Sequence, residues 1–323
     1  MQRRAFLLRL AALAAGSVAV GACTSGAPML VGIHPWPGYE PLYLARNFGW
    51  LPEGVRLREG QTAGDSVAAL QTGEVDAATL TLDEALSVRA SGVALTVVLV
   101  FDSSVGADMV MARPSIRVPA DVAGRRIAVE RGAVGEVVLQ KLLDAAGLEK
   151  ADVTVLDLAP DRQLDAWRAG AIDVAIGYEP FSSLLGREGA RRLFDSRQFP
   201  GIIFDVLAVR SDRLSALRAQ VDALLVGHFR ALTHLRVNRE DALRRIAAWR
   251  GLSFDEAERS YTGLNLPDAA GNRSYLDPTG ARGILRAARE LNALMLRVGS
   301  IKQADDLVGL IDPSFLPRNG GVP

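Results

Sequence analysis

The 323-residue sequence contains one cysteine, Cys23. A single cysteine allows no disulfide within the chain and no cluster of thiolate metal ligands. Because Cys23 directly follows an N-terminal apolar segment, acylation explains it better than nucleophilic catalysis does. We therefore expect no catalytic cysteine, no metal site and no cofactor in the folded part of the chain.

The sequence also lacks an excess of charge of one sign. It has 37 Lys plus Arg and 37 Asp plus Glu. Loss of Arg3, Arg4 and Arg9 with an N-terminal leader would leave a mildly acidic protein. There is no basic run and no basic patch with interleaved aromatic residues. This composition argues against nucleic acid as a partner.

Long hydrophobic runs are absent beyond the N-terminus, although 49% of the residues are hydrophobic. Residues 10–22 are apolar, contain no acidic residue and follow the three arginines named above. This run is shorter than the roughly 20 apolar residues that a membrane-spanning helix needs. It predicts a signal peptide over residues 1–22, followed by a linker over residues 23–28 and a globular protein.

The end of this leader, Val20-Gly21-Ala22-Cys23, resembles the lipobox of bacterial lipoproteins. It predicts cleavage before Cys23 and membrane attachment through a lipid on Cys23, on the periplasmic or cell-surface side of the cytoplasmic membrane. Arg3-Arg4 resembles a twin-arginine export signal, but Gln2 departs from its usual Ser or Thr. The Sec and twin-arginine routes both stay open, and an uncleaved anchor with an incidental cysteine is the alternative.

Short β-like apolar runs alternate with helical stretches, which predicts an α/β fold with largely parallel sheets. Helical stretches between the strands include residues 66–71 and 135–146. The predicted strands are residues 30–33, 55–58, 77–80, 96–101, 127–130, 153–156, 174–176 and 204–209.

The C-terminal third of the sequence is dominated by helical patterns. Asp212 is a plausible N-cap for a helical region over residues 213–249, where apolar residues recur at helical spacing. Ser253 is expected to cap the next helix, with Glu256 in the capping-box position. Residues 278–298 are predicted to form another helix.

Two parts of the sequence are copies of one unit. Residues 69–78 align with residues 166–175, and the same offset relates the strand at 30–33 to the strand at 127–130. In each copy a glycine, Gly73 or Gly170, is expected to end a helix in the left-handed conformation. The aspartate that follows, Asp76 or Asp173, is expected to bond backbone at strand entry. Two similar lobes with a ligand cleft at the carboxyl ends of their strands are therefore predicted.

Four groups of motifs follow one another along the chain. They are residues 36–45 with Phe48-Gly49, Ala69-Leu70 with Gly73, Val75 and Asp76, residues 123–129, and residues 170–173 running to 178–181. In these motifs the sequence resembles the periplasmic binding proteins for nitrate, sulfonates, taurine and thiamine-pyrimidine precursors. The resemblance covers almost the whole mature chain, and the order and spacing of the motifs are more specific than any one of them.

The resemblance implies a two-lobe periplasmic-binding-protein fold of type II, each lobe a mostly parallel sheet flanked by helices. Lobe one would comprise residues 29–108 plus 205–323, and lobe two residues 109–204, with crossings near 107–113 and 204–210. The resemblance further implies a monomer that closes over a small-molecule ligand and docks on an ABC permease in the inner membrane.

The loops after the predicted strands supply the candidate ligand-binding residues. Trp36 and Tyr39 offer flat apolar faces with a polar edge, and the small residues of loops 61–65 and 132–135 expose backbone N–H groups. Loop 132–135 lacks the Ser or Thr common there in the family, which weakens the expectation of a sulfonate or nitrate ligand. The candidates are Trp36, Gly38, Tyr39, Thr62, Thr81, Asp102, Ala133, Tyr178, Glu179 and Asp205.

Acidic residues near the predicted cleft favour a ligand with an amine or other cationic group. Asp102, Asp108, Glu179 and Asp205 would give the cleft a negative face. Because an isolated buried carboxylate is costly, a basic partner is expected. Arg113 or Arg131 is the candidate, in which case a zwitterionic ligand would also fit. Glu179 is alternatively expected to cap a helix that begins at Pro180.

Three classes of function remain after these observations. An extracytoplasmic binding lipoprotein for a sulfonate, taurine-like, amine-bearing or pyrimidine-like solute is favoured. A ligand sensor that presents its closed form to a membrane receptor is the second class. An enzyme resembling the thiamine-pyrimidine synthases is the third, but their cysteine-rich motif is absent. His228 and His234 are six residues apart on one predicted helix, so they face different directions and are expected to form no metal site.

Overall fold

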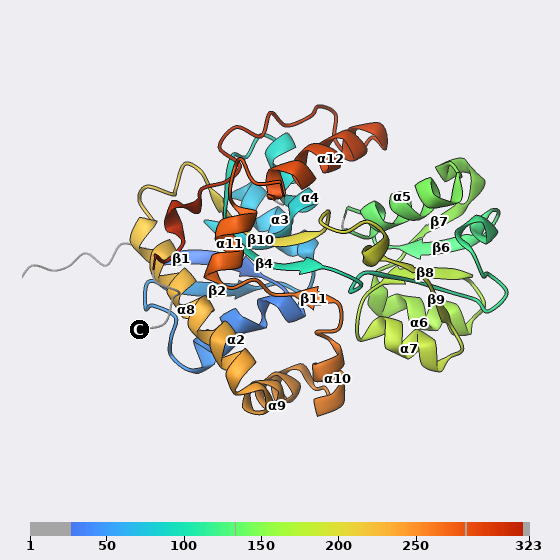
Figure 1. Ribbon diagram of the computed structural model, residues 1–323, viewed down its shortest axis with the longest axis horizontal. Helices are drawn as coiled ribbons and strands as arrows, with labels where there is room; N and C mark the ends of the chain where they lie inside the picture. Colours follow the sequence, from blue (N-terminus) through green and yellow to red (C-terminus); the bar gives the residue numbers. More distant parts are fainter. Residues whose placement is uncertain (1–26, 133, 282, 319–323) are drawn as a thin grey trace, which may run out of the picture.

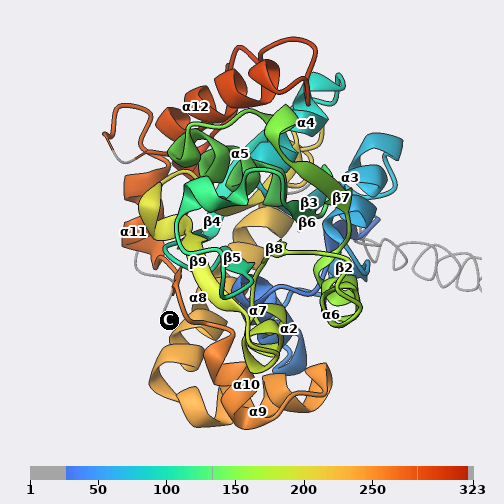
Figure 2. The ribbon, with the colours of Figure 1, turned by 90° about the vertical axis from the view of Figure 1, so that its right-hand side faces the viewer.

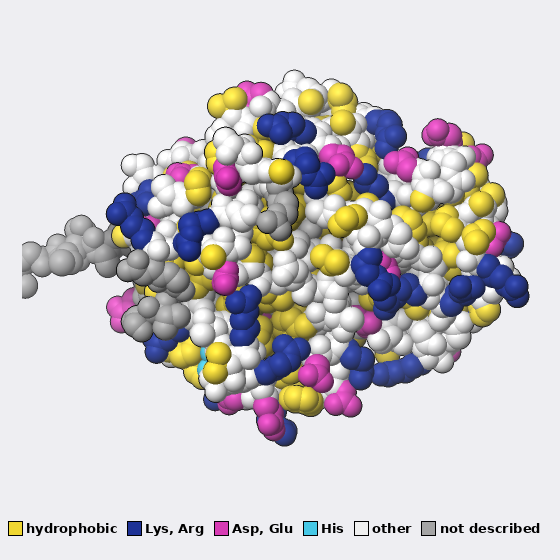
Figure 3. Space-filling view, in the orientation of Figure 1, with side chains coloured by type: hydrophobic (Ala, Val, Ile, Leu, Met, Phe, Trp, Pro, Cys, Tyr) yellow, Lys and Arg dark blue, Asp and Glu magenta, His cyan; other side chains and the backbone are white. Residues whose placement is uncertain are grey.

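The computed structural model describes residues 27–132, 134–281 and 283–318, which form two α/β lobes arranged along the longest axis of the molecule (Figure 1). The predicted leader, Cys23 and the candidate Ala133 lie outside the described residues. Within the described residues no helix is both long and apolar enough to cross a membrane. Charged side chains of both signs are interspersed over the face shown in Figure 3.

The first lobe is built on a six-stranded sheet with the strand order β11-β4-β10-β3-β1-β2. Strand β1 pairs in parallel with β2 and β3, whereas β10 runs antiparallel to β3 and β4. The strands are β1 (Met29–Ile33), β2 (Val55–Glu59), β3 (Ala77–Thr81), β4 (Leu95–Ser104), β10 (Phe204–Arg210) and β11 (Leu264–Asn265).

The second lobe is built on a five-stranded sheet with the strand order β7-β6-β8-β5-β9. Strand β6 pairs in parallel with β7 and β8, and β5 runs antiparallel to β8 and β9. The orders β2-β1-β3 and β7-β6-β8 are therefore equivalent, as the duplication predicts. The strands are β5 (Met109–Ala112), β6 (Arg126–Val129), β7 (Thr154–Asp157), β8 (Val174–Gly177) and β9 (Arg191–Asp195).

Helices cover both sheets. Helices α5, α6 and α7 surround the second sheet, while α12 and the group α8, α9 and α10 lie on opposite sides of the molecule (Figure 2). The helices are α2 (Glu40–Asn47), α3 (Ala63–Thr72), α4 (Leu82–Ala90), α5 (Gly135–Ala146), α6 (Pro160–Arg168), α7 (Phe181–Arg187), α8 (Arg218–Val237), α9 (Arg239–Arg250), α10 (Phe254–Arg259), α11 (Ala269–Tyr275) and α12 (Ile284–Arg297). Short 3-10 helices are η1 (Pro37–Tyr39), η2 (Pro119–Val122), η3 (Lys150–Asp152), η4 (Ser196–Gln198) and η5 (Pro313–Phe315).

The repeated Gly-x-x-Asp segment has the predicted structural role in both lobes. Gly73 and Gly170 have φ of 75° and 67°, the left-handed region that glycine enters at little cost. Asp76 Oδ2 accepts a hydrogen bond from the backbone N–H of Leu30 at 2.9 Å. Asp173 Oδ2 accepts one from the backbone N–H of Arg126 at 3.1 Å. Each aspartate thus ties the entry of its own strand to the entry of the neighbouring parallel strand.

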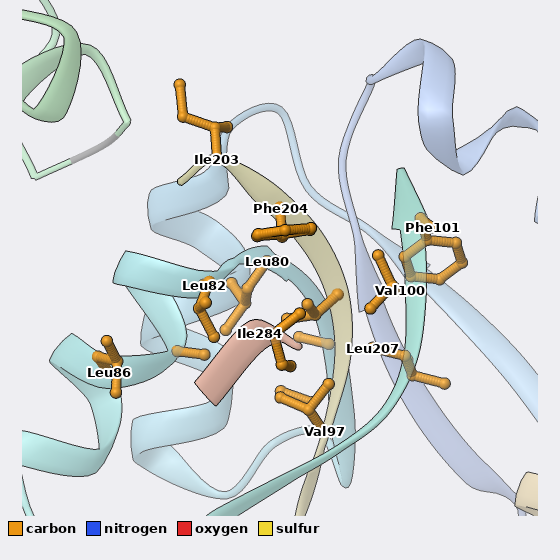
Figure 4. Packing of buried hydrophobic residues seen from close by; sticks show 14 of the residues in the cluster. Leu80, Leu82, Leu86, Val97, Val100, Phe101, Ile203, Phe204, Leu207 and Ile284 are labelled. Carbon is orange, nitrogen blue, oxygen red and sulfur yellow. The ribbon is translucent and has the colours of Figure 1, made fainter. Parts of the chain in front are cut away.

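The apolar core of the first lobe joins segments that are far apart in the sequence. Leu80, Leu82, Phe204 and Ile284 are buried and lie together where β3, α4, β10 and α12 meet (Figure 4). Complete burial of such side chains contributes about 1.5–3 kcal/mol each. This packing explains why helix α12, near the C-terminus, belongs with the N-terminal sheet.

Several predicted boundaries in the C-terminal third are wrong. Helix α8 begins at Arg218 rather than at 213, and the carboxylate of Asp212 pairs with Arg210 at 3.1 Å instead of capping the helix. Helix α12 begins at Ile284, because Asp277 Oδ1 accepts from the backbone N–H of Thr279 and holds a turn there. The capping box at Ser253 is confirmed, with Ser253 Oγ accepting from the backbone N–H of Glu256 at 3.2 Å.

Two chain segments link the sheets, and they are hydrogen-bonded to each other. They are residues 105–108, between β4 and β5, and residues 196–203, between β9 and β10. Ser196 Oγ accepts from the backbone N–H of Gly106 at 2.6 Å and lies 2.7 Å from Ser104 Oγ. Residues 109–112 and 204–210, which the resemblance places in the crossings, instead form β5 and β10, since each pairs with strands on both sides.

Candidate ligand-binding cleft

A cavity of about 470 Å³ lies between the two lobes and is lined by residues of both. Each of the parallel strands β1, β2, β3, β6, β7 and β8 contributes a lining residue at or just beyond its carboxyl end, which is where the duplication places the cleft. From the first lobe these residues include His34, Trp36, Thr62, Thr81, Glu84 and Asp205. From the second lobe and its link they include Asp108, Glu130, Asp161, Tyr178, Glu179 and Phe181.

Two aromatic rings meet across the cleft. Trp36 follows β1 and Tyr178 follows β8, and their ring centroids are 5.1 Å apart with an interplanar angle of 89°. The orientation of the indole is fixed by a hydrogen bond, because Trp36 Nε1 donates to Asp102 Oδ2 at 3.0 Å. Tyr178 is positioned from its own side by an edge-to-face contact with Phe181. This contact between lobes places two amphipathic aromatic faces on one cavity.

Tyr39 and Gly38 lie behind the cavity wall rather than in it. Tyr39 is fully buried and its hydroxyl donates to Asp205 Oδ1. A Cβ at Gly38 would clash with the carboxylate of Asp102 and approach the indole nitrogen of Trp36. Gly38 and Tyr39 therefore position Asp102, Asp205 and Trp36. Trp36 and Asp205 line the cavity, whereas Gly38, Tyr39 and Asp102 are not among the described residues that line it.

Buried carboxyl groups form the floor of the cavity and the layer beneath it: Asp108 and Asp205 line the cavity, and Asp102 lies behind them. Asp102 and Asp205 face each other on the paired strands β4 and β10. Burial raises the pKa of Asp102 to about 7 and that of Asp108 to about 6, and it raises the pKa of Asp205 well above its usual value. Asp102 Oδ1 and Asp108 Oδ2 are buried with no hydrogen-bond partner among the described residues. Part of this floor is therefore protonated at neutral pH.

Glu84, Glu130 and Asp161 extend the acidic lining and were not among the sequence candidates. Burial, followed by the nearby carboxylate of Asp83, raises the pKa of Glu84 to about 8. Burial also raises the pKa of Glu130, with added repulsion from Asp161. Their positions in the sequence could have identified two of them as cleft residues. Glu130 ends a predicted strand, and Glu84 lies three residues after the candidate Thr81.

The predicted basic partners do not reach the cleft, so that expectation is wrong. The guanidinium of Arg113 lies over the ring of Trp167, 3.8 Å from its centroid, and donates to the Trp167 carbonyl oxygen. Arg131 is exposed, and its Nε lies 3.9 Å from Asp157 Oδ2. Arg113 follows β5 on its far side, and cation–π stacking on Trp167 holds it there.

Thr62 and Glu179 line the cavity, but their visible hydrogen bonds are helix caps. Thr62 Oγ1 accepts from the backbone N–H of Asp65 at the start of α3. Glu179 Oε2 accepts from the backbone N–H of Ser183 in α7 at 3.1 Å, as the alternative prediction for Glu179 states. Neither bond prevents the side chain from contacting a ligand, so their binding roles stay predictions.

The histidines show no sign of a metal site. His228 is fully buried between Phe101 and Phe229, and burial lowers its pKa to about 3, so it is the packing histidine that was predicted. His234 lies 2.9 Å from Asp241 on the surface. Burial lowers the pKa of His34 at the cleft to about 4, which leaves it neutral. Across the described ranges, no group of three or more His, Asp or Glu could hold a metal ion.

A sequence-family model described as NMT1/THI5 like matches residues 36–227, which is more than half of the chain. The taurine-binding periplasmic protein of Escherichia coli (strain K12) is 27% identical over 161 residues. That alignment covers 49% of this chain and 50% of the relative, so the chain spans about half the length of the relative it matches.

Solved structures share the architecture over nearly the whole chain. The periplasmic aliphatic sulphonate binding protein SsuA from Escherichia coli has a TM-score of 0.75 and 18% identity, and covers 89% of this chain and 92% of its own. The desulfurization enzyme DSZB has a TM-score of 0.65 and 19% identity, with 89% and 97% covered. These identities establish the fold alone, and they confirm the predicted two-lobe periplasmic-binding-protein fold of type II. Because a binding protein and an enzyme share it, the fold does not choose between binding and catalysis.

Proposed function

This chain belongs to the NMT1/THI5-like family, and from that premise we propose that it is an extracytoplasmic solute-binding protein of an ABC importer. It captures a small organic solute between its lobes and delivers it to a permease in the inner membrane. The carrying observation is the cavity of about 470 Å³ that both lobes line. A cavity of this size suits a small molecule, and aromatic walls with a few placed polar groups are typical of such sites.

The proposed mechanism is closure about the two hydrogen-bonded links. Residues 29–108 plus 204–323 would move as one lobe and residues 109–203 as the other, one residue from the predicted boundary because Phe204 begins β10. A solute that contacts both lobes stabilises the closed state, whereas one that contacts a single lobe binds without favouring closure. Trp36 and Tyr178, which belong to opposite lobes, would be in contact in the closed form. The backbone of the links, around Asp108 and Ser196, would change conformation as the lobes open.

The proposed location is the outer face of the cytoplasmic membrane, with the protein held as a monomer by a lipid on Cys23. The leader over residues 1–22 and the lipobox-like segment support this part of the proposal. Globomycin, which blocks lipoprotein signal peptidase, should make a longer precursor accumulate in cells. A Cys23→Ser variant that fractionates with membranes as the wild type does would refute the lipid anchor.

Binding rather than catalysis is proposed for the cleft. The single cysteine, Cys23, lies outside the described residues, and the buried carboxyl groups of the floor have raised pKa values that suit a dry binding site. A solute bound by an importer protein should be released unchanged. Recovery of a chemically altered solute after prolonged incubation would favour the enzyme alternative.

Native mass spectrometry of the freshly purified mature protein tests the proposed function. We expect a co-purified small molecule, and small-angle scattering should show a smaller radius of gyration with it than after its removal. A double variant, Trp36→Ala with Tyr178→Ala, should lose the bound molecule while keeping its circular dichroism spectrum. The proposal fails if the wild type binds no small molecule and its scattering never changes.

A further inference from the structure

The inter-lobe cavity carries an imbalance of charge. Its acidic lining residues are Glu40, Glu84, Asp108, Glu130, Asp161, Glu179 and Asp205. Its basic lining residues, within the described part of the chain, are His34 and Arg250. The outer face in Figure 3 mixes both signs, so the acidity is a property of the cavity and not of the protein as a whole.

The basic groups do not offset this imbalance. Arg250 Nε donates to Glu40 Oε1 at 2.5 Å and Trp249 donates to the second oxygen of Glu40, so the charge of Arg250 is paired within the chain. Arg250 Nη2 is the part of this pair that is buried with no hydrogen-bond partner among the described residues. The low pKa of His34 makes it neutral. Among the described residues, no Lys or Arg forms an ion pair with Glu84, Asp108, Glu130, Asp161 or Asp205.

The unpaired carboxyl groups line the same cavity as Tyr178. Burial, and then the charges of Glu130, Asp108, Glu84 and Asp161, raise the pKa of the Tyr178 hydroxyl. Asp108 lines the cavity, is only 3% exposed, and its Oδ2 has no partner among the described residues. A buried, unpartnered carboxylate oxygen on a cavity wall lacks the hydrogen-bond donor that such groups normally have.

Three of the helix N-termini at the cavity carry a carboxylate of the chain's own. Free N–H groups at a helix N-terminus normally attract negative charge. At α3 Asp65 lies in the first turn and accepts from the backbone N–H groups of Gln61 and Thr62, which directly precede the helix. At α4 Glu84 accepts from the backbone N–H of Thr81, and at α7 Glu179 does so from Ser183. The negative charge at the starts of α3, α4 and α7 thus opposes a bound anion there, whereas α5 and α6 begin at the cavity without a capping side chain.

From this geometry we propose that the solute carries a cationic nitrogen group, bound between Glu84 and Asp205 of the first lobe and Glu130 of the second. This inference rests on the proposed function and names its ligand class. The apolar part of the solute would lie against Trp36 and Tyr178, whose ring faces also attract cations. Glu84 and Asp205, whose pKa values are raised in the empty cleft, would ionise against the bound cation, because a nearby positive charge lowers the pKa of a carboxyl group. Closure would then depend on the positive charge of the solute.

Three probes of similar shape and different charge test the inference. They are benzylamine, benzyl alcohol and phenylmethanesulfonate, titrated calorimetrically into ligand-free protein at pH 7.5. We expect benzylamine to bind at least about tenfold more tightly than the alcohol, with a dissociation constant that rises with salt, and the sulfonate to bind most weakly. Equal or tighter binding of the sulfonate overturns the inference.

Charge-neutral variants locate the cation. Glu84→Gln and Glu130→Gln keep the side-chain shape, and each should weaken benzylamine binding about tenfold while changing benzyl alcohol binding little. Glu53→Gln, an exposed carboxylate that does not line the cavity, is the matched control and should bind as the wild type does. If both cavity variants retain wild-type affinity for benzylamine, the assigned site is wrong.

The failure of this inference is separable from failure of the proposed function. If the co-purified molecule is an anion without a cationic nitrogen and it closes the lobes, the importer role stands and the charge class is overturned. If neither a co-purified molecule nor any probe binds, both proposals fail. A co-purified amine or guanidine whose binding Glu84→Gln weakens supports both.

Discussion

The two lobes share one folding unit but differ in how they hold their part of the cleft. In the first lobe β3 and β4 are buried along their whole length, and the C-terminal helices enclose the sheet. The second lobe has a smaller sheet of five strands, which α5, α6 and α7 cover. The first lobe therefore supplies a fixed floor, Trp36 above Asp102, and the second supplies a cover through Tyr178. A duplicated unit diverges in this way when only one copy is reinforced by later segments of the chain.

The largest expected effect concerns the cores. Phe204→Ala in the first lobe should lower the free energy of unfolding by about 3–5 kcal/mol, because the ring is buried among β3, α4 and α12. Phe194→Ala in the second lobe should cost less, since β9 is an edge strand. Denaturant unfolding followed by circular dichroism measures both. An equal or larger loss for Phe194→Ala would contradict the contrast between the lobes.

Removal of the repeated aspartates, Asp76 and Asp173, should destabilise the two lobes to a similar extent. Asp76→Ala and Asp173→Ala each remove a partly buried hydrogen bond to a strand entry and an ion pair, with Arg213 and Arg126 respectively. Each should cost about 1–3 kcal/mol of stability. Asp76→Asn and Asp173→Asn keep the acceptor oxygen and should cost less. Widely different losses for the two alanine variants would show that the copies have diverged here too.

The stability of the ligand-free protein should fall by about 1–2 kcal/mol between pH 6.5 and about pH 8.5. Burial raises the pKa of Glu84 from 4.5 to about 8, so the folded protein retains a proton that the unfolded chain has already released. Rising pH therefore removes stability. His34 and His228 have lowered pKa values and oppose this trend, but only below their ordinary value of 6.5.

Variants at the two acids test the origin of this pH dependence. Glu84→Gln should flatten the profile between pH 6.5 and about pH 8.5, whereas Glu130→Gln should change it less, because Glu130 is only half-buried. Thermal unfolding across this pH range is the measurement. An unchanged slope in Glu84→Gln would assign the effect to another group, such as Asp102, whose pKa is raised to about 7.

The smallest expected effects separate the two aromatic residues of the cleft. Trp36→Phe removes the donor to Asp102 and frees the ring, so probe affinity should fall about tenfold. Tyr178→Phe keeps the edge-to-face contacts with Trp36 and Phe181, so affinity should fall less. Calorimetric titration of benzylamine compares them. A larger loss for Tyr178→Phe would mean that the second lobe, through its hydroxyl, contributes the stronger contact.

Local sequence signals predicted much of the fold. Helix α5 begins and ends where the pattern places it, because Gly135 and Gly147 bound a clean apolar stripe. The strands β1, β3 and β8 and the capping box at Ser253 were also predicted. The strands β5 and β9 were missed, because a strand of four or five residues that pairs with distant partners has little signal of its own.

The site was predicted less fully than the fold. Trp36, Thr62, Thr81, Tyr178, Glu179 and Asp205 were identified and line the cavity, since residues after parallel strands must meet at one edge. Glu84 and Glu130 were missed because an acidic residue at a helix start usually serves as a cap. Arg113 was wrongly assigned to the cleft, because sequence position does not reveal which side of a strand end a long side chain takes.

By itself the sequence determined the duplicated α/β unit, the cleft at its strand ends and the identity of the aromatic residues beside it. Periodicity, glycine positions and strand order are local properties, so they can be recognised without coordinates. Only the tertiary structure decided the charge of the cleft, because that depends on which carboxylates converge and which arginines are held elsewhere. Burial then set their protonation, since desolvation acts on a group through everything packed around it.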